Sequence, residues 1–455
     1  MDFKKYKEGY GSLLRLGMPV LVTQLGIIVV NFADTMMVGR YGTDQLAAAA
    51  FVNSLFVVLT VMQIGFASGL TPLIGALFSS GKHHEAGATL RGGLQMNVIL
   101  SLSFTVIMGG IYFFLDCFGQ KEELLPLIRS YYLIILFSLL PMAVFNTIQQ
   151  TCNGITDTRT PMWFILLANA LNIFGNYLFI FGNWGMPELG LMGAGLSTLF
   201  ARIFAAIGIA VYFFNRRTYR AYRNGYREVK PSGELRMRVW LTSYPIMIQS
   251  GVECMLWAFG GIVCGWYSKI QLAAYQVVNT IAQLGFMIYL SFTTAVTILV
   301  ANFTGVRDFK SVRRITIAGL HLILLLSTGA SLLFLFGGKM LIHFFTPDEA
   351  VIASGLGLIL PLVVYQYMDG VQLTYCNAIR GTSKVKPLLW ISLLTYLVIG
   401  IPLLLLFARE FPVANQGVFW CFCVALGIAG VLLVRSFYRI IRRMEAEVLT
   451  ETVVR

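Results

Sequence analysis

Three acidic side chains lie inside long apolar stretches of the sequence, where a charge is costly to place. They are Asp34 in NFADTMMVG, Glu253 in SGVECMLWA and Asp369 in VYQYMDGVQLTYCNAIRG. An ionised residue at the centre of a membrane-spanning helix costs roughly 2.5 to 3.5 kcal/mol on insertion scales, so such residues mark functional sites. A carboxylate in this position can bind and release a metal cation or a proton. The three acids therefore indicate a protein that uses an ion gradient.

Polar side chains on a further apolar stretch support a cation site. Asn169, Asn172 and Asn176 are spaced i, i+3 and i+7, which places them on one face of a helix. Carboxylate and amide oxygens together suit sodium, or a proton that is shared through hydrogen bonds. Two alternatives stay open at this point. Asparagines in membrane helices also hold helices together, and the acids could be protonated or paired with Arg202.

The elements that carry these residues are hydrophobic helices. Of the 455 residues, 57% are hydrophobic and 12% are charged, and the mean hydropathy is +0.75, which is more apolar surface than a soluble core can hide. Apolar runs of about 20 residues can cross a hydrocarbon layer of roughly 30 Å as helices. The sequence predicts an all-α membrane protein with twelve such spans, at 13–38, 46–78, 92–115, 127–152, 161–182, 190–214, 240–265, 270–303, 314–337, 351–378, 388–408 and 416–437.

The basic residues predict the orientation of these spans. Alternate connections carry 27 Lys and Arg residues on one side and six on the other, so the positive-inside rule places both termini in the cytoplasm. The net charge of +13 then follows from this topology and from contact with anionic lipid headgroups, and no nucleic-acid partner is needed. The first apolar run is too long for the core of a cleaved signal peptide.

The sequence repeats itself. TCNGITDTRTP at 151–161 resembles YCNAIRGTSKVKP at 375–387, and a shift of 226 positions aligns QLAA at 45–48 with QLAA at 271–274. Each half holds six spans, an even number, so the halves are parallel repeats about an axis along the membrane normal. We expect an N-terminal lobe at 1–214, a basic cytoplasmic linker at 215–239 and a C-terminal lobe at 240–455 that ends in a cytoplasmic tail.

Residue types predict two details of the connections. The linker interleaves Tyr and Arg, which favours contact with lipid headgroups. In the first repeated segment, Asn153 and Thr158 are expected to cap helix ends, and Pro161 is expected to start the next helix.

The repeat also tests whether the three acids belong to the shared scaffold. The aligned positions carry Gly260 opposite Asp34, Ile27 opposite Glu253 and Phe145 opposite Asp369. Residues that the architecture requires should appear in both halves. The acids are therefore interpreted as additions made for function.

Several function classes lack their motifs. The sequence has no GxxxxGK[ST] loop for ATP, so an ion gradient or a partner ATPase on another chain must supply the energy. It has no HExxH or GxSxG, and its four histidines form no catalytic set, so a membrane-embedded enzyme is not expected. Six of the seven cysteines lie within spans and are expected to pack as thiols rather than to form a disulfide framework. No cofactor is expected apart from the coupling ion, Na⁺ or H⁺.

Three stretches give the chain a family resemblance over about residues 15–437. FADTMMVGRYG, NALNIFGNYLFIFG followed by GLMGAGLST, and YQYMDGVQLTYCNAIRG together resemble the multidrug and toxic compound extrusion (MATE) family. The NorM-like branch is the most similar, because it has acids in spans one, seven and ten. The resemblance implies a V-shaped fold of two six-helix lobes.

The resemblance also implies roles for individual residues. Asp34 would serve a site in the N-terminal lobe, and Glu253, Asp369 and Tyr365 would form a cation site, with Na⁺ as the candidate metal, in the C-terminal lobe. Asn172, Asn176 and Thr198 would help Asp34 to bind a cation; of these three, Thr198 is named from the resemblance alone. In the DinF-like branch, an aspartate stands at the position of Asn176, and the proton mechanism is confined to the N-terminal lobe. Because this chain has an asparagine at that position, the same mechanism is not expected here.

The function implied is efflux of cationic, amphipathic drugs or dyes in exchange for sodium or protons, across the cytoplasmic membrane of a bacterium. No obligatory protein partner is evident. A flippase for a lipid-linked saccharide, from the same broader superfamily, is the alternative. Such a protein would be expected to line its cleft with Arg and Lys for pyrophosphate, yet Arg202 is the single basic residue well inside a predicted span.

Overall fold

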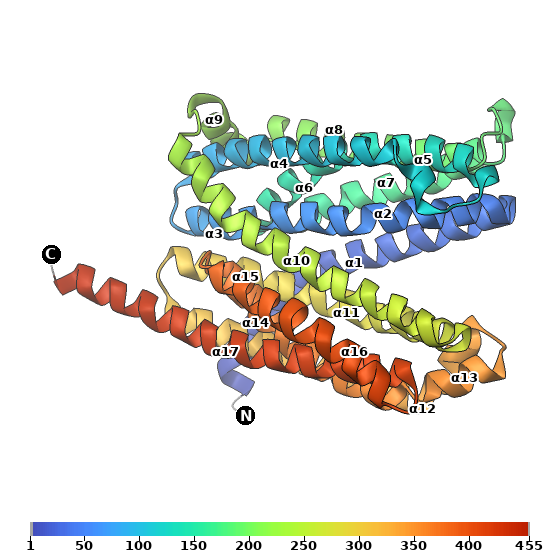
Figure 1. Ribbon diagram of the computed structural model, residues 1–455. Coiled ribbons are helices and arrows are strands. Elements are labelled where there is room, and N and C mark those ends of the chain that lie inside the picture. Colours follow the sequence, from blue (N-terminus) through green and yellow to red (C-terminus); the bar gives the residue numbers. More distant parts are fainter. Residues whose placement is uncertain (1–2, 454–455) are drawn as a thin grey trace. The chain divides into compact units, whose positions relative to one another are not determined.

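The computed structural model describes residues 3–453, and every regular element in that range is helical (Figure 1). Eleven of the described helices are long and apolar enough to cross a membrane, and one bent pair makes a twelfth candidate. In lipid, helices satisfy all their backbone hydrogen bonds within the segment, so apolar runs of this length fold as helices. The predicted all-α class is confirmed, and the twelve predicted spans correspond to the eleven helices and the bent pair.

The chain forms two compact units. The first contains residues 22–247. It holds the C-terminal half of α1 (Phe3–Tyr41), together with α2 (Thr43–Ser68), α3 (Leu70–Ser79), α4 (His83–Tyr112), α5 (Leu125–Phe137), α6 (Leu139–Gly154), α7 (Arg159–Phe179), α8 (Leu191–Asn215) and α9 (Arg220–Glu228). We call it the N-terminal unit.

The second unit contains residues 1–21 and 248–455 and is called the C-terminal unit. It holds most of α10 (Gly233–Tyr267), with α11 (Lys269–Gly305), α12 (Phe309–Phe345), α13 (Glu349–Leu356), α14 (Ile359–Gly381), α15 (Lys386–Ser392), α16 (Ile401–Glu410) and α17 (Ala414–Val453). The sequence boundaries between the two units fall within the helices α1 and α10. The expected linker at 215–239 therefore lies wholly in the N-terminal unit.

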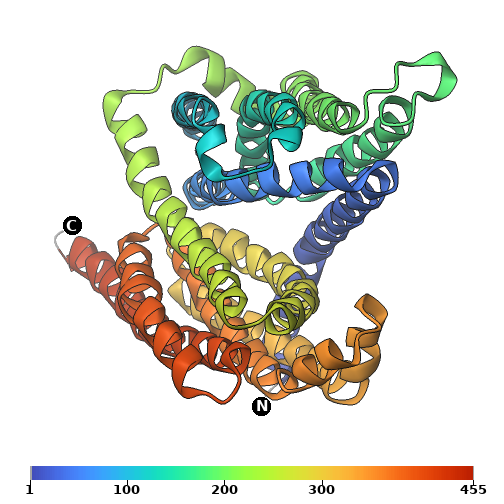
Figure 2. The same cartoon turned by 45° about the vertical axis from the view of Figure 1, so that its right-hand side comes forward.

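Helix α14 is the central element of the C-terminal unit. It packs against α11, α12 and α17, and Figure 2 shows α17, in red, along one edge of this unit. The pair α13 and α14 is bent by 48° at Gly357 and Leu358. Pro361 lies in the first turn of α14, where its missing N–H costs no helix hydrogen bond. The burial of α14 on several sides brings its polar residues into the interior.

A π-helical segment, Leu393–Gly400, precedes Pro402 in the same unit. Proline removes a backbone donor and disturbs the regular helix before it, and π segments recur at functional sites. The segment carries Tyr396, which is 2% exposed. Its hydroxyl accepts a hydrogen bond from Gln372 of α14 at 2.9 Å.

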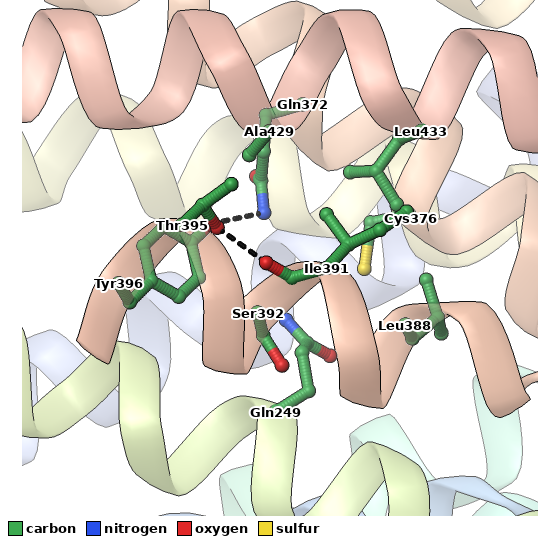
Figure 3. Close-up of a pocket in the computed structure, with 10 residues that line it drawn as sticks. All are labelled: Gln249, Gln372, Cys376, Leu388, Ile391, Ser392, Thr395, Tyr396, Ala429 and Leu433. Atoms are coloured by element: carbon green, nitrogen blue, oxygen red, sulfur yellow. Dashed lines mark hydrogen bonds between the residues drawn. The ribbon is translucent and has the colours of Figure 1, made fainter. Parts of the chain in front are cut away.

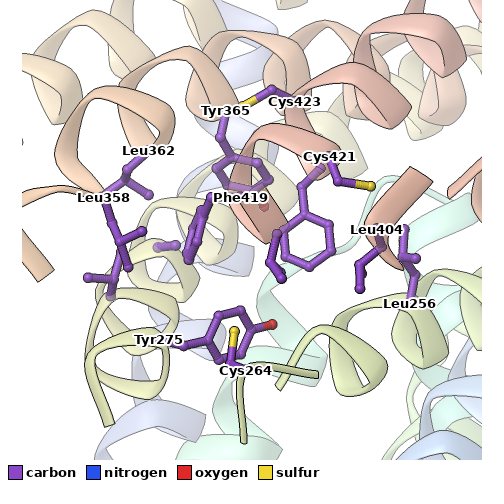
Figure 4. Packing of buried hydrophobic residues seen from close by; sticks show 14 of the residues in the cluster. Leu256, Cys264, Tyr275, Leu358, Leu362, Tyr365, Leu404, Phe419, Cys421 and Cys423 are labelled. Carbon is purple, nitrogen blue, oxygen red and sulfur yellow. The ribbon is translucent and has the colours of Figure 1, made fainter. Parts of the chain in front are cut away.

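The core of the C-terminal unit is aromatic and sulfur-rich (Figure 4). Trp257 packs edge-on against Tyr365, with ring centroids 5.2 Å apart, and lies 4.1 Å from Phe422. Cys421 and Cys423 are buried and donate to backbone carbonyl oxygens. All seven cysteines are free, as predicted.

The linker residues fold onto the N-terminal unit. Tyr219 and Tyr222 are 3% and 6% exposed, and Tyr219 stacks on Phe213 with centroids 4.5 Å apart. Tyr222 shares a hydrogen bond of 3.1 Å with His83, and its burial raises the pKa of its hydroxyl to about 12. The expected headgroup contact is therefore wrong for these two tyrosines, because their rings fill the protein core.

The cap predicted at the start of α7 is also wrong in detail. Thr158 makes no side-chain cap hydrogen bond. The neighbouring Asp157 accepts one from the backbone N–H of Thr160 at 3.1 Å and another from the Tyr219 hydroxyl. A carboxylate next to the first turn also interacts favourably with the helix dipole, so it replaces the hydroxyl cap.

We expect Gly225→Ala to loosen the linker. A Cβ at Gly225 of α9 would lie 2.1 Å from the carbonyl oxygen of His84 in α4, and overpacking of this kind typically costs roughly 1 to 3 kcal/mol. The thermal midpoint of the purified protein should fall, and trypsin should cut faster at the exposed arginines of the linker. Gly233→Ala is the control, because its Cβ would meet nothing within 4 Å. Equal cleavage rates in both variants would contradict the packing described.

Candidate functional site

Asp34 lies in a polar cluster of the N-terminal unit. Its carboxylate comes from α1, and Asn176 of α7, which is fully buried, donates to it at 2.5 Å. With its amide oriented to satisfy both neighbours, Asn172 donates to Asp34 at 2.8 Å and accepts from the Thr198 hydroxyl of α8 at 3.1 Å. The structure thus brings together the four residues that the sequence assigned to this lobe.

Arg202 of α8 is the basic residue that the sequence places well inside a span and that could have paired with the acids. Its guanidinium donates to the Ser138 hydroxyl at 2.6 Å, and it interacts electrostatically with Asp34 and Tyr131. It therefore adds positive potential near the acid without a direct ion pair. The side-chain oxygen of Asn176 is buried and has no partner among the described residues, which leaves an acceptor beside the carboxylate.

The C-terminal unit contains the second acidic cluster. Asp369 is 1% exposed and Tyr365, one turn earlier on α14, is 4% exposed. Glu253 of α10 is partly buried, and it interacts electrostatically with Asp369. One oxygen of Asp369 has no hydrogen-bond partner among the described residues. The structure therefore brings Glu253, Asp369 and Tyr365 together in one cluster.

The sequence interpretation missed two members of this cluster. Gln249, one turn before Glu253 on α10, donates to the Glu253 carboxylate at 2.8 Å. Arg380, in the last turn of α14, donates to the Gln249 side-chain oxygen at 2.5 Å. The i, i+4 spacing of Gln249 and Glu253 was a usable signal. Arg380 was counted with the cytoplasmic connection, although it lies on the same helix as Asp369.

A small cavity lies next to this second cluster (Figure 3). Gln249 and Gln372 reach it from opposite sides, and Cys376 and Tyr396 also line it. Its volume of about 10 Å³ is enough for about one water molecule. The Gln372 side-chain oxygen is buried without a partner among the described residues. A cavity that holds about one water molecule next to the acids is too small to hold a drug.

The two clusters share one chemical property. Buried carboxylates are unfavourable unless a charge or several hydrogen bonds compensate them. The ion pairs recorded for the described residues involve other acids, namely Glu85, Asp116, Glu228 and Glu445. Among the side chains that the structure describes, residues 6–450, no three His, Cys, Asp or Glu side chains gather as a metal centre. Carboxylate, phenol and amide oxygens are nevertheless the kind of donor set that hard cations prefer.

The sequence model of the MatE family matches this chain twice, at residues 19–178 and 245–406. The two matches begin 226 residues apart, at 19 and at 245, which is the offset of the internal repeat. The predicted repeat is thereby confirmed. Together the two matches cover more than half of the chain.

Curated relatives span nearly the whole chain. The probable multidrug resistance protein NorM of Agrobacterium fabrum is 26% identical over 439 residues, which covers 95% of this chain and 94% of that protein. The protein of the same name from Idiomarina loihiensis is 26% identical over 449 residues, with 96% of each chain covered.

Solved structures share the fold. A crystal structure of MATE in complex with MaL6 has a TM-score of 0.87 at 17% identity and covers 96% of this chain and 97% of that one. A MOP superfamily transporter from Pyrococcus furiosus has a TM-score of 0.86 at 18% identity, with the same coverage. The chain belongs to the MatE family, and it is a multi-pass membrane transporter of the NorM-like branch rather than an enzyme.

Proposed function

We propose that the protein is a secondary active multidrug efflux antiporter. It exports cationic amphipathic compounds in exchange for Na⁺ or H⁺ by alternating access. The observation that carries this proposal is the acid pair of the C-terminal unit, in which Asp369 is buried and one of its oxygens has no partner among the described residues. Burial without a direct counter-charge gives such a pair a strong tendency to take up a cation.

Coupling follows from thermodynamic linkage. An ion that binds Glu253 and Asp369 better in one conformation shifts the protein toward that conformation, and the drug must prefer the other. Ion binding from the outside would then favour drug release, and drug loading from the cytoplasm would favour the return. Tyr365 would supply a phenol oxygen to the same ion, and Asp34 with Asn172, Asn176 and Thr198 would serve a second, N-terminal site.

The substrate class rests on the relatives and on charge. The curated relatives are named as multidrug resistance proteins. Carboxylates attract cations, and aromatic faces bind organic cations by cation–π contact. We propose further that the protein works in a bacterial cytoplasmic membrane with both termini in the cytoplasm, and that it needs no cofactor or obligatory protein partner beyond the coupling ion.

A reconstituted system tests the proposal. Purified protein in liposomes loaded with ethidium should release the dye when a sodium gradient or a proton gradient is imposed, and protein-free liposomes should not. The comparison of the two gradients identifies the coupling ion. Absence of efflux under either gradient would contradict the proposal. Movement of a fluorescent lipid-linked saccharide in the same vesicles would then support the flippase alternative.

A further inference from the structure

Arg380 places a fixed positive charge beside the acid pair of the C-terminal unit. Its guanidinium donates to the Gln249 side-chain oxygen at 2.5 Å and lies 3.5 Å from the Ser250 hydroxyl. Gln249 in turn donates to Glu253 at 2.8 Å, and Arg380 interacts electrostatically with Glu253. One amide therefore connects the arginine of α14 to the acid of α10.

The chemistry of arginine fixes the direction of this connection. A guanidinium only donates hydrogen bonds and stays charged in proteins, so the Gln249 oxygen must face Arg380. The Gln249 NH₂ group must then face Glu253, which accepts as a carboxylate. Arg380 thus acts indirectly. It orients the Gln249 amide that donates to Glu253, and it does not donate to the Glu253 carboxylate itself.

The formal charges of the cluster leave one negative charge uncompensated. When both acids are ionised, Glu253 and Asp369 contribute two negative charges, and Arg380 contributes one positive charge. Buried sites favour occupants that bring the local charge close to zero, and the number of charged ligands tunes which cation binds and how tightly. A net charge of minus one is matched by one monovalent cation. Without Arg380, the same two acids would match a divalent cation or two monovalent ones.

We propose that Arg380, through Gln249, is the specificity-determining residue that restricts this acid pair to a single monovalent cation. The inference rests on the proposed ion-coupled function and adds the valence and number of the coupling ions. The competing explanation is that Arg380 only ties α10 to α14. The two explanations predict different cation binding by variants that change the charge of the cluster and keep its hydrogen bonds.

The test is binding of radiolabelled calcium and sodium to the purified full-length protein in detergent. Arg380→Gln removes the positive charge, and Gln249→Glu keeps Arg380 and adds a negative charge with almost no change of shape. Each variant brings the cluster to minus two by a different route. Arg380→Lys keeps the charge and is the matched control.

We expect both charge-changing variants to bind calcium at least roughly ten-fold more tightly than wild type, with Arg380→Lys like wild type. The double variant Arg380→Gln with Asp369→Asn returns the net charge of the cluster to minus one. It should therefore lose the increase in calcium affinity, which would show that the calcium binds at the acid pair. Calcium binding that stays at the wild-type level in both Arg380→Gln and Gln249→Glu overturns the inference.

The two proposals fail separately. The calcium measurement uses no gradient and no drug, so it decides the role of Arg380. The dye-efflux measurement on wild type decides the antiporter function. Wild-type efflux with no calcium gain in either variant would contradict the inference and leave the antiporter intact. A calcium gain without any wild-type efflux would support the charge argument and contradict the proposed transport function.

Discussion

Asp369→Asn should abolish ion-driven dye efflux. The substitution keeps the size of the side chain but removes a negative charge that is 1% exposed on α14. The acid pair would then have one carboxylate, Glu253, whose charge the nearby Arg380 already compensates, so no net charge is left to attract the coupling ion. We expect efflux under the driving gradient to fall close to the background of protein-free liposomes, by about 150-fold, the upper end of typical coupling energies.

The matched control for this variant is Asp44→Asn, which makes the same chemical change at an exposed position in the first turn of α2. Its efflux should equal that of wild type. Both variants should keep the wild-type thermal midpoint within a few degrees, so that a loss of efflux reports function rather than folding. Normal gradient-driven efflux by Asp369→Asn would show that the coupling ion binds elsewhere.

Asp34→Asn should produce the second large loss, with a different signature. Asp34 accepts from Asn176 at 2.5 Å and from Asn172 at 2.8 Å, so the change replaces an ionic acceptor with a neutral amide and removes the negative charge of that cluster. Efflux should fall by roughly 5- to 150-fold. The coupling ion should still bind the purified protein, because Glu253 and Asp369 are unchanged.

Two assays separate these outcomes. Dye efflux from liposomes measures transport, and radiolabelled sodium, or a pH dye if protons drive the wild type, measures ion binding to purified protein. Thr35→Ala is the control on the same helix, since its hydroxyl donates only to the backbone of Asn31. A variant Asp34→Asn that transports like wild type would restrict function to the C-terminal unit.

Much of this architecture was predictable because lipid imposes simple rules. Apolar length predicts spans, and helix periodicity placed Asn172 and Asn176 on one face, where both contact Asp34. The three acids have no acidic counterpart at the aligned positions of the other half, which indicated that they serve function. The structure places the same three residues in two polar clusters. These inferences needed only local spacing and the internal repeat.

The features that the sequence did not reveal depend on contacts between distant helices. Arg380 follows an apolar run and counts as a loop residue by the positive-inside rule, although its side chain reaches Gln249, 131 residues away. Tyr219 and Tyr222 lie in a polar, basic stretch, yet they fill the core of the N-terminal unit. The π-helical segment that carries Tyr396 leaves no signal beyond Pro402.

The central claim is that the acid pair of the C-terminal unit carries the ion that is exchanged for the drug. Its most direct test is to record counter-ion entry and dye exit in the same liposomes, for wild type and Asp369→Asn. The account predicts that in wild type an inward flux of Na⁺ or H⁺ accompanies dye exit, and that both fluxes disappear together in the variant. Dye exit with no accompanying ion flux, or an ion flux that Asp369→Asn leaves unchanged, would contradict it.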